Sequence, residues 1–258
     1  VISGDAAVLG VAALLQLWGG AQPPPRCFPS SVRDYLMALP QGVLAGDFPK
    51  ASDVARAIRE DVDLDGSASS SLEEVETLHQ QLFAAMRAAA PNDPAMGMEG
   101  NSGQLEVQRE VYGALSLSRS LVTVCETGFG AGHSALNWLA GNPSRHVHSF
   151  DLGTLGGANV GEEFVHTMFP QRLTLTRGDS SETVPEYLGA HSALTCDLVH
   201  IDGGHFDFTP WNDLVELARA SHDSTILVVD DTPSIGDVAR AIRIAEKAGL
   251  VQEIGCWG

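Results

Sequence analysis

The sequence is poor in positive charge and in aromatic residues. Lys and Arg number 15 against 33 Asp and Glu, which gives a formal net charge of -18, and aromatic residues make up 6% of the chain. Nucleic-acid affinity comes largely from Lys and Arg side chains that neutralise phosphates, so this balance argues against DNA, RNA and anionic membrane surfaces as partners. A small neutral or cationic molecule is the easier partner on electrostatic grounds.

Cysteine is also scarce, and no two cysteines have the spacing of a zinc site. Of the four cysteines, Cys125 and Cys196 lie within or beside apolar runs that are typical of strands. Free cysteine is among the most buried residue types, so the sequence predicts buried, unpaired thiols in a reducing compartment. The expected location is therefore intracellular, either cytoplasmic or organellar.

The chain has no apolar run of the length that spans a membrane as a helix. The run from Ala6 to Leu17 is shorter than the ~20 residues that such a helix needs. Three interpretations remain: the end of a targeting segment, a truncated anchor, or a helix docked on another surface. The last two make residues 1–50 a contact with a protein partner or a membrane-associated complex. Val1 in place of Met favours the removal of an upstream segment.

Three regions differ in composition. Residues 1–50 join the apolar start to a Pro- and Gly-rich extension, residues 51–103 form a helical segment that serves as a lid or docking surface, and residues 104–258 read as an α/β domain. The stretch Asp61–Gly66 copies the first half of an EF-hand loop, D-x-D-x-D-G. Leu72 stands where the bidentate Glu belongs, so a solvated acidic turn is the favoured interpretation.

Short apolar runs alternate with helical patterns in the α/β region. This alternation predicts an α/β fold with a doubly wound, mainly parallel sheet and an N-terminal helical extension. The expected strands are Leu121–Cys125, His146–Phe150, Leu173–Arg177, Leu198–Ile201, Ile226–Val229 and Leu250–Ile254. The expected helices between them are Ser134–Leu139, Val160–Met168, Thr183–Tyr187, Pro210–Ala220 and Ile235–Ala248.

A glycine-rich turn follows the first of these strands. Its sequence is E-x-G-x-G-x-G, from Glu126 through Gly128 and Gly130 to Gly132. In an open parallel sheet, ligands bind beyond the carboxyl ends of the strands, where glycine lets the backbone approach them. A dinucleotide-binding turn has its third glycine one residue later, so an NAD-linked oxidoreductase is disfavoured.

Acidic residues close the following strands. Asp151 ends the second strand and is placed to accept hydrogen bonds from ribose hydroxyls. Asp202 ends the fourth strand, and Asp230 and Asp231 end the fifth. Carboxylates that converge at one edge repel one another unless a cation or proton intervenes, and oxygen ligands favour Mg²⁺ or Ca²⁺. The alternative is that these acids cap the helices that follow them.

Taken in order, these motifs resemble the class I S-adenosylmethionine (SAM)-dependent methyltransferase family over residues 104–255. The segments DLVHIDGGH and ILVVDD are most similar to the small-molecule branch known as methyltransferase domain 24. That branch is related to the metal-dependent catechol, caffeoyl-CoA and macrolide-sugar O-methyltransferases. The resemblance implies a Rossmann-like fold, SAM as the cofactor and a small-molecule acceptor.

The resemblance also implies roles for individual residues. It places the cofactor-binding residues in the glycine turn, which includes Phe129, and at the acids that end the expected strands and the residues next to them. The implied cofactor-binding residues are Glu126, Gly128, Phe129, Gly130, Gly132, His133, Asp151, Leu152, Asp179, Ser180 and Asp202. The implied divalent-metal ligands are Asp202, Asp230 and Asp231, and His205 takes the place of a histidine general base, with Asp202 beside it.

Two departures from the family pattern bear on function. Catechol-type enzymes have Asn at the place of Asp231, which leaves the presence and identity of the metal open. The family fold ends with an antiparallel seventh strand, whereas only Leu250–Gly258 follows the last helix here, so that strand is either absent or missing from the chain. Two functions remain: O-methylation of a small molecule, or a methyltransferase-like structural or assembly subunit with little or no turnover.

Overall fold

The computed structural model describes residues 12–17, 67–92, 102, 106–231 and 236–257. The half EF-hand motif and most of the Pro- and Gly-rich extension lie outside the described residues. A long helix, Ser67–Ala89, lies within residues 51–103. The domain boundaries given above stay predictions.

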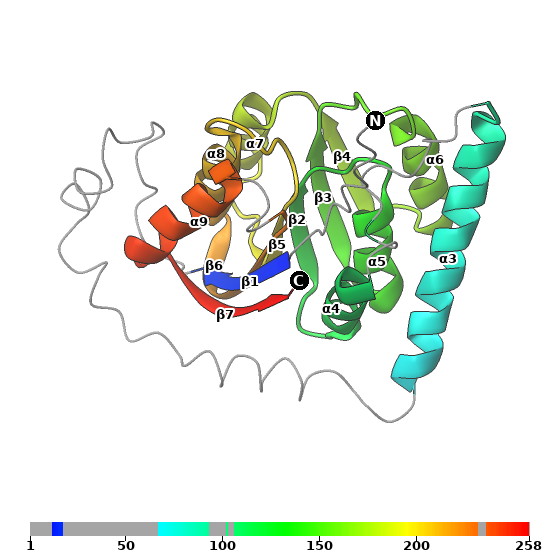
Figure 1. The fold of residues 1–258 in the computed structure, drawn as a ribbon, viewed down its shortest axis with the longest axis horizontal. Helices are drawn as coiled ribbons and strands as arrows, with labels where there is room; N and C mark the ends of the chain where they lie inside the picture. Colours follow the sequence, from blue (N-terminus) through cyan, green and yellow to red (C-terminus); the bar gives the residue numbers. More distant parts are fainter. Residues whose placement is uncertain (1–11, 18–66, 93–101, 103–105, 232–235, 258) are drawn as a thin grey trace, which may run out of the picture.

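Seven strands form one sheet in the order β4-β3-β2-β5-β6-β1-β7. β2, β3, β4, β5 and β6 pair parallel to one another, as predicted for a doubly wound fold (Figure 1). The strands are β1 (Ala12–Leu17), β2 (Thr123–Thr127), β3 (His146–Asp151), β4 (Leu173–Arg177), β5 (Cys196–Ile201), β6 (Ser221–Val229) and β7 (Val251–Trp257).

Helices cover both faces of this sheet. α3, α4, α5 and α6 lie on one face, and α7, α8 and α9 lie on the other (Figure 1). The helices are α3 (Ser67–Ala89), α4 (Glu106–Leu117), α5 (His133–Gly141), α6 (Ala158–Met168), α7 (Ser180–Ala190), α8 (Thr209–Ala218) and α9 (Gly236–Lys247). The α/β fold class, the strands and the helices predicted between them are confirmed, with ends that differ by a few residues.

The antiparallel strand of the sheet comes from the N-terminal part of the chain. β1 pairs antiparallel with β6 on one side and with β7 on the other, with Leu14 opposite Val228 and Gln16 opposite Gln252. The prediction that this strand is absent or missing from the chain is therefore wrong. Residues 12–17 of the apolar run fill its place, where both edges of the strand have backbone partners.

Two apolar cores separate the sheet from its helices. One, between the sheet and α7, α8 and α9, contains Trp211 and Val199, both fully buried. The other, under α3, α4, α5 and α6, contains Trp138, Tyr112 and Val124. Parallel strands buried on both faces are expected to be apolar throughout, which explains the continuous apolar runs in the sequence.

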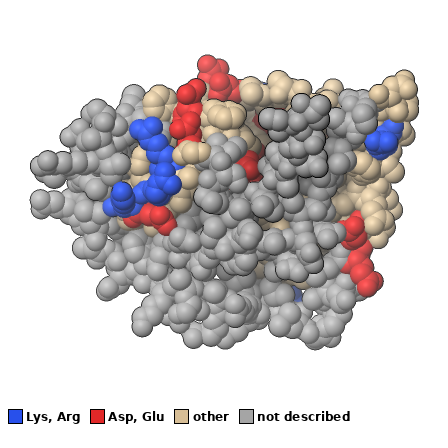
Figure 2. Space-filling view, in the orientation of Figure 1, with Lys and Arg blue, Asp and Glu red and all other residues tan. Residues whose placement is uncertain are grey.

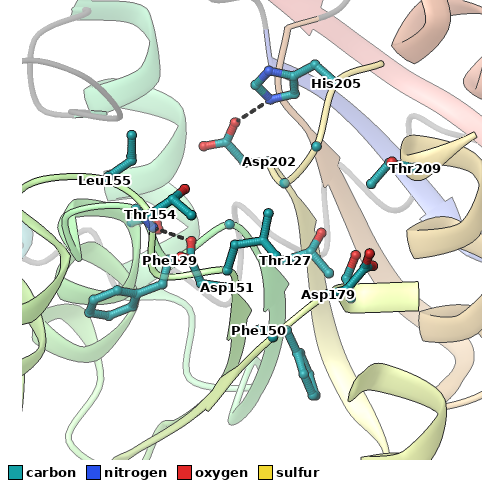
Figure 3. A pocket seen from close by; sticks show the side chains of 18 residues that line it. Thr127, Phe129, Phe150, Asp151, Thr154, Leu155, Asp179, Asp202, His205 and Thr209 are labelled. Carbon is teal, nitrogen blue, oxygen red and sulfur yellow. Dashed lines mark hydrogen bonds and ion pairs between the residues drawn. The ribbon is translucent and has the colours of Figure 1, made fainter. Parts of the chain in front are cut away.

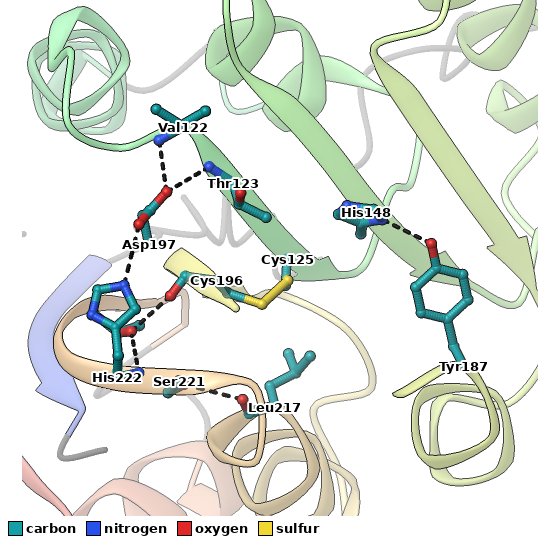
Figure 4. The surroundings of a disulfide bond; sticks show 11 residues. Val122, Thr123, Cys125, His148, Tyr187, Cys196, Asp197, Leu217, Ser221 and His222 are labelled. Atoms are coloured by element: carbon teal, nitrogen blue, oxygen red, sulfur yellow. Dashed lines mark hydrogen bonds and ion pairs between the residues drawn. A yellow bond between two sulfur atoms is a disulfide. The ribbon is translucent and has the colours of Figure 1, made fainter. Parts of the chain in front are cut away.

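Cys125 on β2 and Cys196 on β5 are both fully buried, as predicted, but they are not free thiols. They form a disulfide between neighbouring strands, with Cα atoms 5.9 Å apart (Figure 4). The prediction of unpaired thiols is therefore wrong. The sequence cannot show this pairing because the two residues are 71 positions apart and meet only when the strands pair.

Charged side chains of both signs lie on the described surface. On the face shown in Figure 2, basic side chains gather over α9, which carries Arg240, Arg243 and Lys247, and acidic side chains lie close to them. Among the helices that the structure describes, none is long and apolar enough to cross a membrane. The absence of a nucleic-acid partner stays a prediction.

Candidate active site

Backbone hydrogen bonds hold the carboxyl ends of four parallel strands together. The Gly128 amide donates to the Phe150 carbonyl at 2.8 Å, and the Asp202 amide donates to the Thr127 carbonyl at 2.9 Å. The Asp230 amide extends this rim by donating to the Ile201 carbonyl at 3.0 Å. The predicted meeting of the strand ends at one edge of the sheet is thus present in the structure.

The glycine turn needs glycine for two separate reasons. At Gly128, φ is +92°, and a Cβ atom would lie 1.9 Å from the Asp202 carbonyl oxygen, so no side chain fits there. At Gly132, φ is +89°, and a Cβ would lie 2.9 Å from the Phe129 ring. Gly132 precedes α5, whose N-terminus therefore starts directly behind the turn. The turn brings backbone against the ends of β2 and β5.

A pocket of about 360 Å³ opens at this edge of the sheet, a volume typical of small-molecule sites. Asp151, Asp179 and Asp202 from three strand ends contribute to its wall (Figure 3). No lysine or arginine is among the described residues that line it. The full lining is Thr127, Gly128, Phe129, Gly130, Ser134, Phe150, Asp151, Leu152, Thr154, Leu155, Gly178, Asp179, Ser180, Asp202, Gly203, Gly204, His205 and Thr209.

Two of the lining acids are fixed by hydrogen bonds to neighbouring loops. Asp151 accepts from the Gly130 amide at 2.8 Å and also from the Gly153 amide, so it joins the glycine turn to the loop after β3. Asp179 caps α7 by accepting from the Ser181 amide at 2.9 Å. Carboxylates held in this way keep lone pairs that can accept further hydrogen bonds from hydroxyl or amino groups.

Three residues predicted to bind the cofactor do not line the pocket. Glu126 is fully buried behind the turn and accepts hydrogen bonds from Ser134, Trp138 and Ser149 at 2.8–3.2 Å. From this position Glu126 braces the glycine turn from behind. Gly132 shapes the start of α5 without reaching the cavity.

His133 is the third residue outside the pocket. Its fully buried ring faces α3, where its Nδ1 lies 2.8 Å from Nδ1 of His79. Burial and the neighbouring His79 lower the pKa of His133 from 6.5 to about 3. The ring is therefore neutral at physiological pH and joins α3 to α5, and a role in cofactor binding is not assigned to it.

A histidine and two carboxylates form a compact group at one end of the pocket. His205 Nε2 lies 3.4 Å from Asp202 Oδ1 (Figure 3). The same nitrogen lies 3.2 Å from Asp231 Oδ2. One donor atom from each of the three residues lies within 4.8 Å of the others, the arrangement of a metal-ligand group. The pKa of His205 is raised, chiefly by Asp202 and further by Asp231, while burial opposes the change. The imidazole is therefore well placed to take up a proton.

Asp230 differs from the other two predicted metal ligands in the direction of its side chain. It is buried, and its carboxylate faces Gln108 and Tyr112 on α4; neither Asp230 nor Asp231 lines the pocket. Burial raises its pKa above the ordinary value for aspartate. Among the described residues, the group that could hold a cation thus contains His205 in place of Asp230. Asp230 as a metal ligand stays a prediction, and its side chain points into the protein.

Several pocket residues were not predicted. Gly203 and Gly204 directly follow Asp202, and their small size next to a strand end was a usable signal. Thr154 and Leu155 come from the irregular loop after β3, and no spacing or composition marks them. Together the pocket offers acids for a nucleoside, a backbone turn for close approach, and a histidine–carboxylate group that can accept a proton.

Comparison with known proteins finds a methyltransferase domain in part of the chain. A family model described as "Methyltransferase domain" matches residues 125–232, which run from β2 through β6 and contain the glycine turn and all the acids of the site. No curated protein sequence matches the chain.

Solved structures with similar folds include several methyltransferases. A putative O-methyltransferase from Klebsiella pneumoniae is 16% identical, with a TM-score of 0.45, covering 76% of this chain and 83% of that one. The TDP-rhamnose 3'-O-methyltransferase CalS11 of calicheamicin biosynthesis is 17% identical, with a TM-score of 0.41 and 82% of each chain covered. The O-methyltransferase from Bacillus cereus in complex with SAH is 12% identical, with a TM-score of 0.42, covering 80% and 82%. Similarities this low carry no weight for substrate or reaction.

The family model and the site coincide. The matched residues supply every strand end that lines the pocket, and the glycine turn and the acids lie there in the predicted order. Residues 125–232 therefore match a methyltransferase domain, and the candidate site lies within the matched segment.

Proposed function

We propose that this protein transfers the methyl group of SAM to a hydroxyl group of a small molecule, with His205 as the general base. The observation that carries the proposal is the single pocket that joins the glycine turn and Asp151 to His205. SAM lies along Gly128, Phe129 and Gly130, with its ribose at Asp151. Asp179, Ser180 and Leu152 take the adenine end, and the methyl group points toward His205.

The reaction needs little chemistry from the protein. The sulfonium of SAM makes its methyl carbon electrophilic, and the acceptor oxygen attacks it in line with the C–S bond. The O–C bond forms as the C–S bond breaks, which leaves S-adenosylhomocysteine, and the hydroxyl proton passes to Nε2 of His205. Asp202 and Asp231, each within 3.4 Å of that nitrogen, stabilise the imidazolium that results.

The same three side chains fit a divalent cation. Nε2 of His205 is buried between two carboxylates and has no hydrogen-bond partner among the described residues, an environment that suits a metal ligand. Asp202, His205 and Asp231 would hold the ion, which when bound supplies Lewis-acid stabilisation of a developing oxyanion. One nitrogen cannot both bind a cation and accept a proton, so this is a second candidate arrangement for the acceptor end of the site.

The acceptor class follows from the charge of the pocket. Its described lining contains carboxylates and no basic side chain, and Leu152 at its mouth is 63% exposed. Phosphates and carboxylates on an acceptor would meet like charge there. We therefore expect a neutral or cationic hydroxyl compound.

SAM binding is tested first by thermal unfolding. A ligand at 100 times its Kd adds about 2.7 kcal/mol to stability, so SAM should raise the Tm and NAD should not. Gly128→Ala places a methyl group against Asp202 and should abolish the effect of SAM. Gly189→Ala, where a Cβ meets nothing within 4 Å, is the matched control and should keep it. A chain that NAD stabilises and SAM does not would contradict the proposal.

Turnover is tested by methyl transfer from labelled SAM to hydroxylated compounds. His205→Ala should lower kcat roughly 10²- to 10⁴-fold while the Kd of SAM stays unchanged. His191→Ala, on the exposed end of α7, is the control. Loss of activity with EDTA, restored by a divalent metal, would favour the metal arrangement over a histidine base. Tight SAM binding without methyl transfer to any acceptor would favour the assembly-subunit alternative.

A further inference from the structure

Asp230 is held in place by a helix that precedes the matched methyltransferase domain. Gln108 on α4 donates from Nε2 to Asp230 Oδ2, and the Tyr112 hydroxyl lies 3.5 Å from the same oxygen. Both α4 side chains are buried, with Gln108 4% exposed and Tyr112 fully buried. The carboxylate of Asp230 is therefore turned away from the pocket by contacts with α4.

The other oxygen of Asp230 holds its neighbour. Oδ1 accepts a hydrogen bond from the Asp231 amide at 2.8 Å. Asp231 has a φ of +60°, a left-handed conformation that residues other than glycine adopt only when the surroundings fix it. That conformation places Asp231 Oδ2 at 3.2 Å from His205 Nε2. The position of the Asp231 carboxylate thus depends on the orientation of Asp230.

We propose that Gln108 is a positioning residue for the acceptor end of the active site. Acting through Asp230, it fixes Asp231 beside His205, and it does so from α4, outside residues 125–232. The expected effect of Gln108 on kcat rests on the proposed function. The dependence of the Asp231 position on Gln108, the positional link, can be measured without turnover. Buried partners that orient a functional carboxylate typically change affinity or activity 10- to 100-fold when they are lost.

Tyr112 supports the same link from the next turn of α4. Its hydroxyl lies 2.9 Å from Nε2 of His200, which is fully buried on β5. His200 Nδ1 lies 3.5 Å from Glu126, so Tyr112 and His200 connect Asp230 to the brace behind the glycine turn. Contacts from α4 therefore reach Asp230 directly and Glu126 through His200. Loss of a single hydrogen bond affects one of these contacts, whereas displacement of the whole helix would affect both.

The primary test replaces Gln108 by methionine, which keeps the shape of the side chain and removes its donor. Gln80→Met is the matched control, since Gln80 also donates to a carboxylate, Glu76, at 3.2 Å, but on the exposed face of α3. We expect Gln108→Met to lower kcat roughly tenfold and to leave the Kd of SAM within twofold. Gln80→Met should change neither. Equal losses in kcat and SAM affinity, or no loss at all, would overturn the proposal.

A second pair of variants guards against a folding defect in Gln108→Met. Tyr112→Phe removes one hydroxyl, and Tyr187→Phe removes an equivalent hydroxyl that lies 2.9 Å from Nδ1 of His148, outside the pocket lining (Figure 4). Tyr112→Phe should lower kcat without weakening SAM binding, and Tyr187→Phe should not. A drop of the same size in both variants would mean that any lost tyrosine–histidine contact has this effect, and would refute the assignment.

The readout that does not need catalysis is the imidazole spectrum of ¹⁵N-histidine-labelled protein. The ring resonances of His205 should shift in Gln108→Met, because Asp231 moves relative to Nε2, and should stay in place in Gln80→Met. Unmoved His205 resonances in Gln108→Met would refute the positional link. If His205 shifts but the parent protein neither binds SAM nor transfers methyl groups, the link holds and the proposed function fails.

Discussion

Replacing Asp213 by asparagine is expected to stabilise the protein by an amount that grows as pH rises from 3.8 to about 6 and is constant above that range. Asp213 lies on α8 directly under the pocket and is 1% exposed, with no hydrogen-bond partner for either oxygen. Burial raises its pKa from 3.8 to about 6. The nearby hydroxyls of Ser180 and Thr127 act to lower the pKa, but neither has the geometry of a hydrogen bond to the carboxylate.

The magnitude follows from that shift. Each pKa unit is worth about 1.4 kcal/mol, so an aspartate whose pKa rises from 3.8 to about 6 costs the folded state about 3 kcal/mol once it is ionised. Because the raised pKa belongs to the native state, the native protein binds more protons than the unfolded chain between these pH values. The contribution to unfolding free energy therefore falls as pH rises through this range.

Urea unfolding followed by circular dichroism tests this at two pH values. Relative to the parent, Asp213→Asn should gain about 2 kcal/mol in unfolding free energy between pH 4.5 and pH 7.5. Glu163→Gln, a carboxylate-to-amide change at an exposed position, is the control and should show no such gain. A difference between Asp213→Asn and the parent that is the same at both pH values would refute the reasoning.

Three further predictions concern stability. Leu15→Pro removes a backbone donor from β1, which pairs on both edges, and should lower the urea midpoint by an amount corresponding to about 3 kcal/mol or more; an unchanged midpoint would contradict the placement of β1 in the sheet. The Arg145 guanidinium donates to the buried carbonyls of Ser116 and Trp138 at 2.8–2.9 Å, and Arg145→Met leaves these carbonyls without a donor. The variant should lose about 3 kcal/mol of unfolding free energy in chemical unfolding. A loss below about 1 kcal/mol would contradict this role. The pKa of His133 is lowered from 6.5 to about 3, so the neutral ring contributes fully to the free energy of unfolding above pH 6.5, and this contribution falls by on the order of 3 kcal/mol by pH 4. His133→Phe should lose this acid sensitivity in pH-dependent unfolding. An unchanged pH profile would contradict the assignment.

Local signals were sufficient for the parallel part of the fold. Buried strand segments such as Ile226–Val229 in β6 are continuous apolar runs, and turn residues and helical periodicity separate the strands, so their order and type follow from short-range sequence. The glycine turn and the acids at strand ends were found for the same reason. Parallel strands place their carboxyl ends at one edge, and a residue at such an end has its location fixed by topology.

Long-range pairing was not accessible from those signals. β1 is far from β6 and β7 in sequence, and its short apolar run fits an anchor, a targeting segment or a strand equally well. The disulfide between Cys125 and Cys196 likewise depends on strands that meet only in the sheet. In both cases the interaction joins residues that are far apart in the sequence, and no local pattern of residues indicates that they pair.

Side-chain direction was the other quantity that only the tertiary structure decided. The sequence placed Asp202, Asp230 and Asp231 at neighbouring strand ends, and it determined that acids would gather at the rim. Whether each carboxylate faces the pocket depends on what packs behind it: Gln108 turns Asp230 inward, and a left-handed backbone turns Asp231 toward His205. Sequence spacing fixes where a strand ends, whereas the orientation of its last side chains is set by hydrogen bonds from helices elsewhere in the chain.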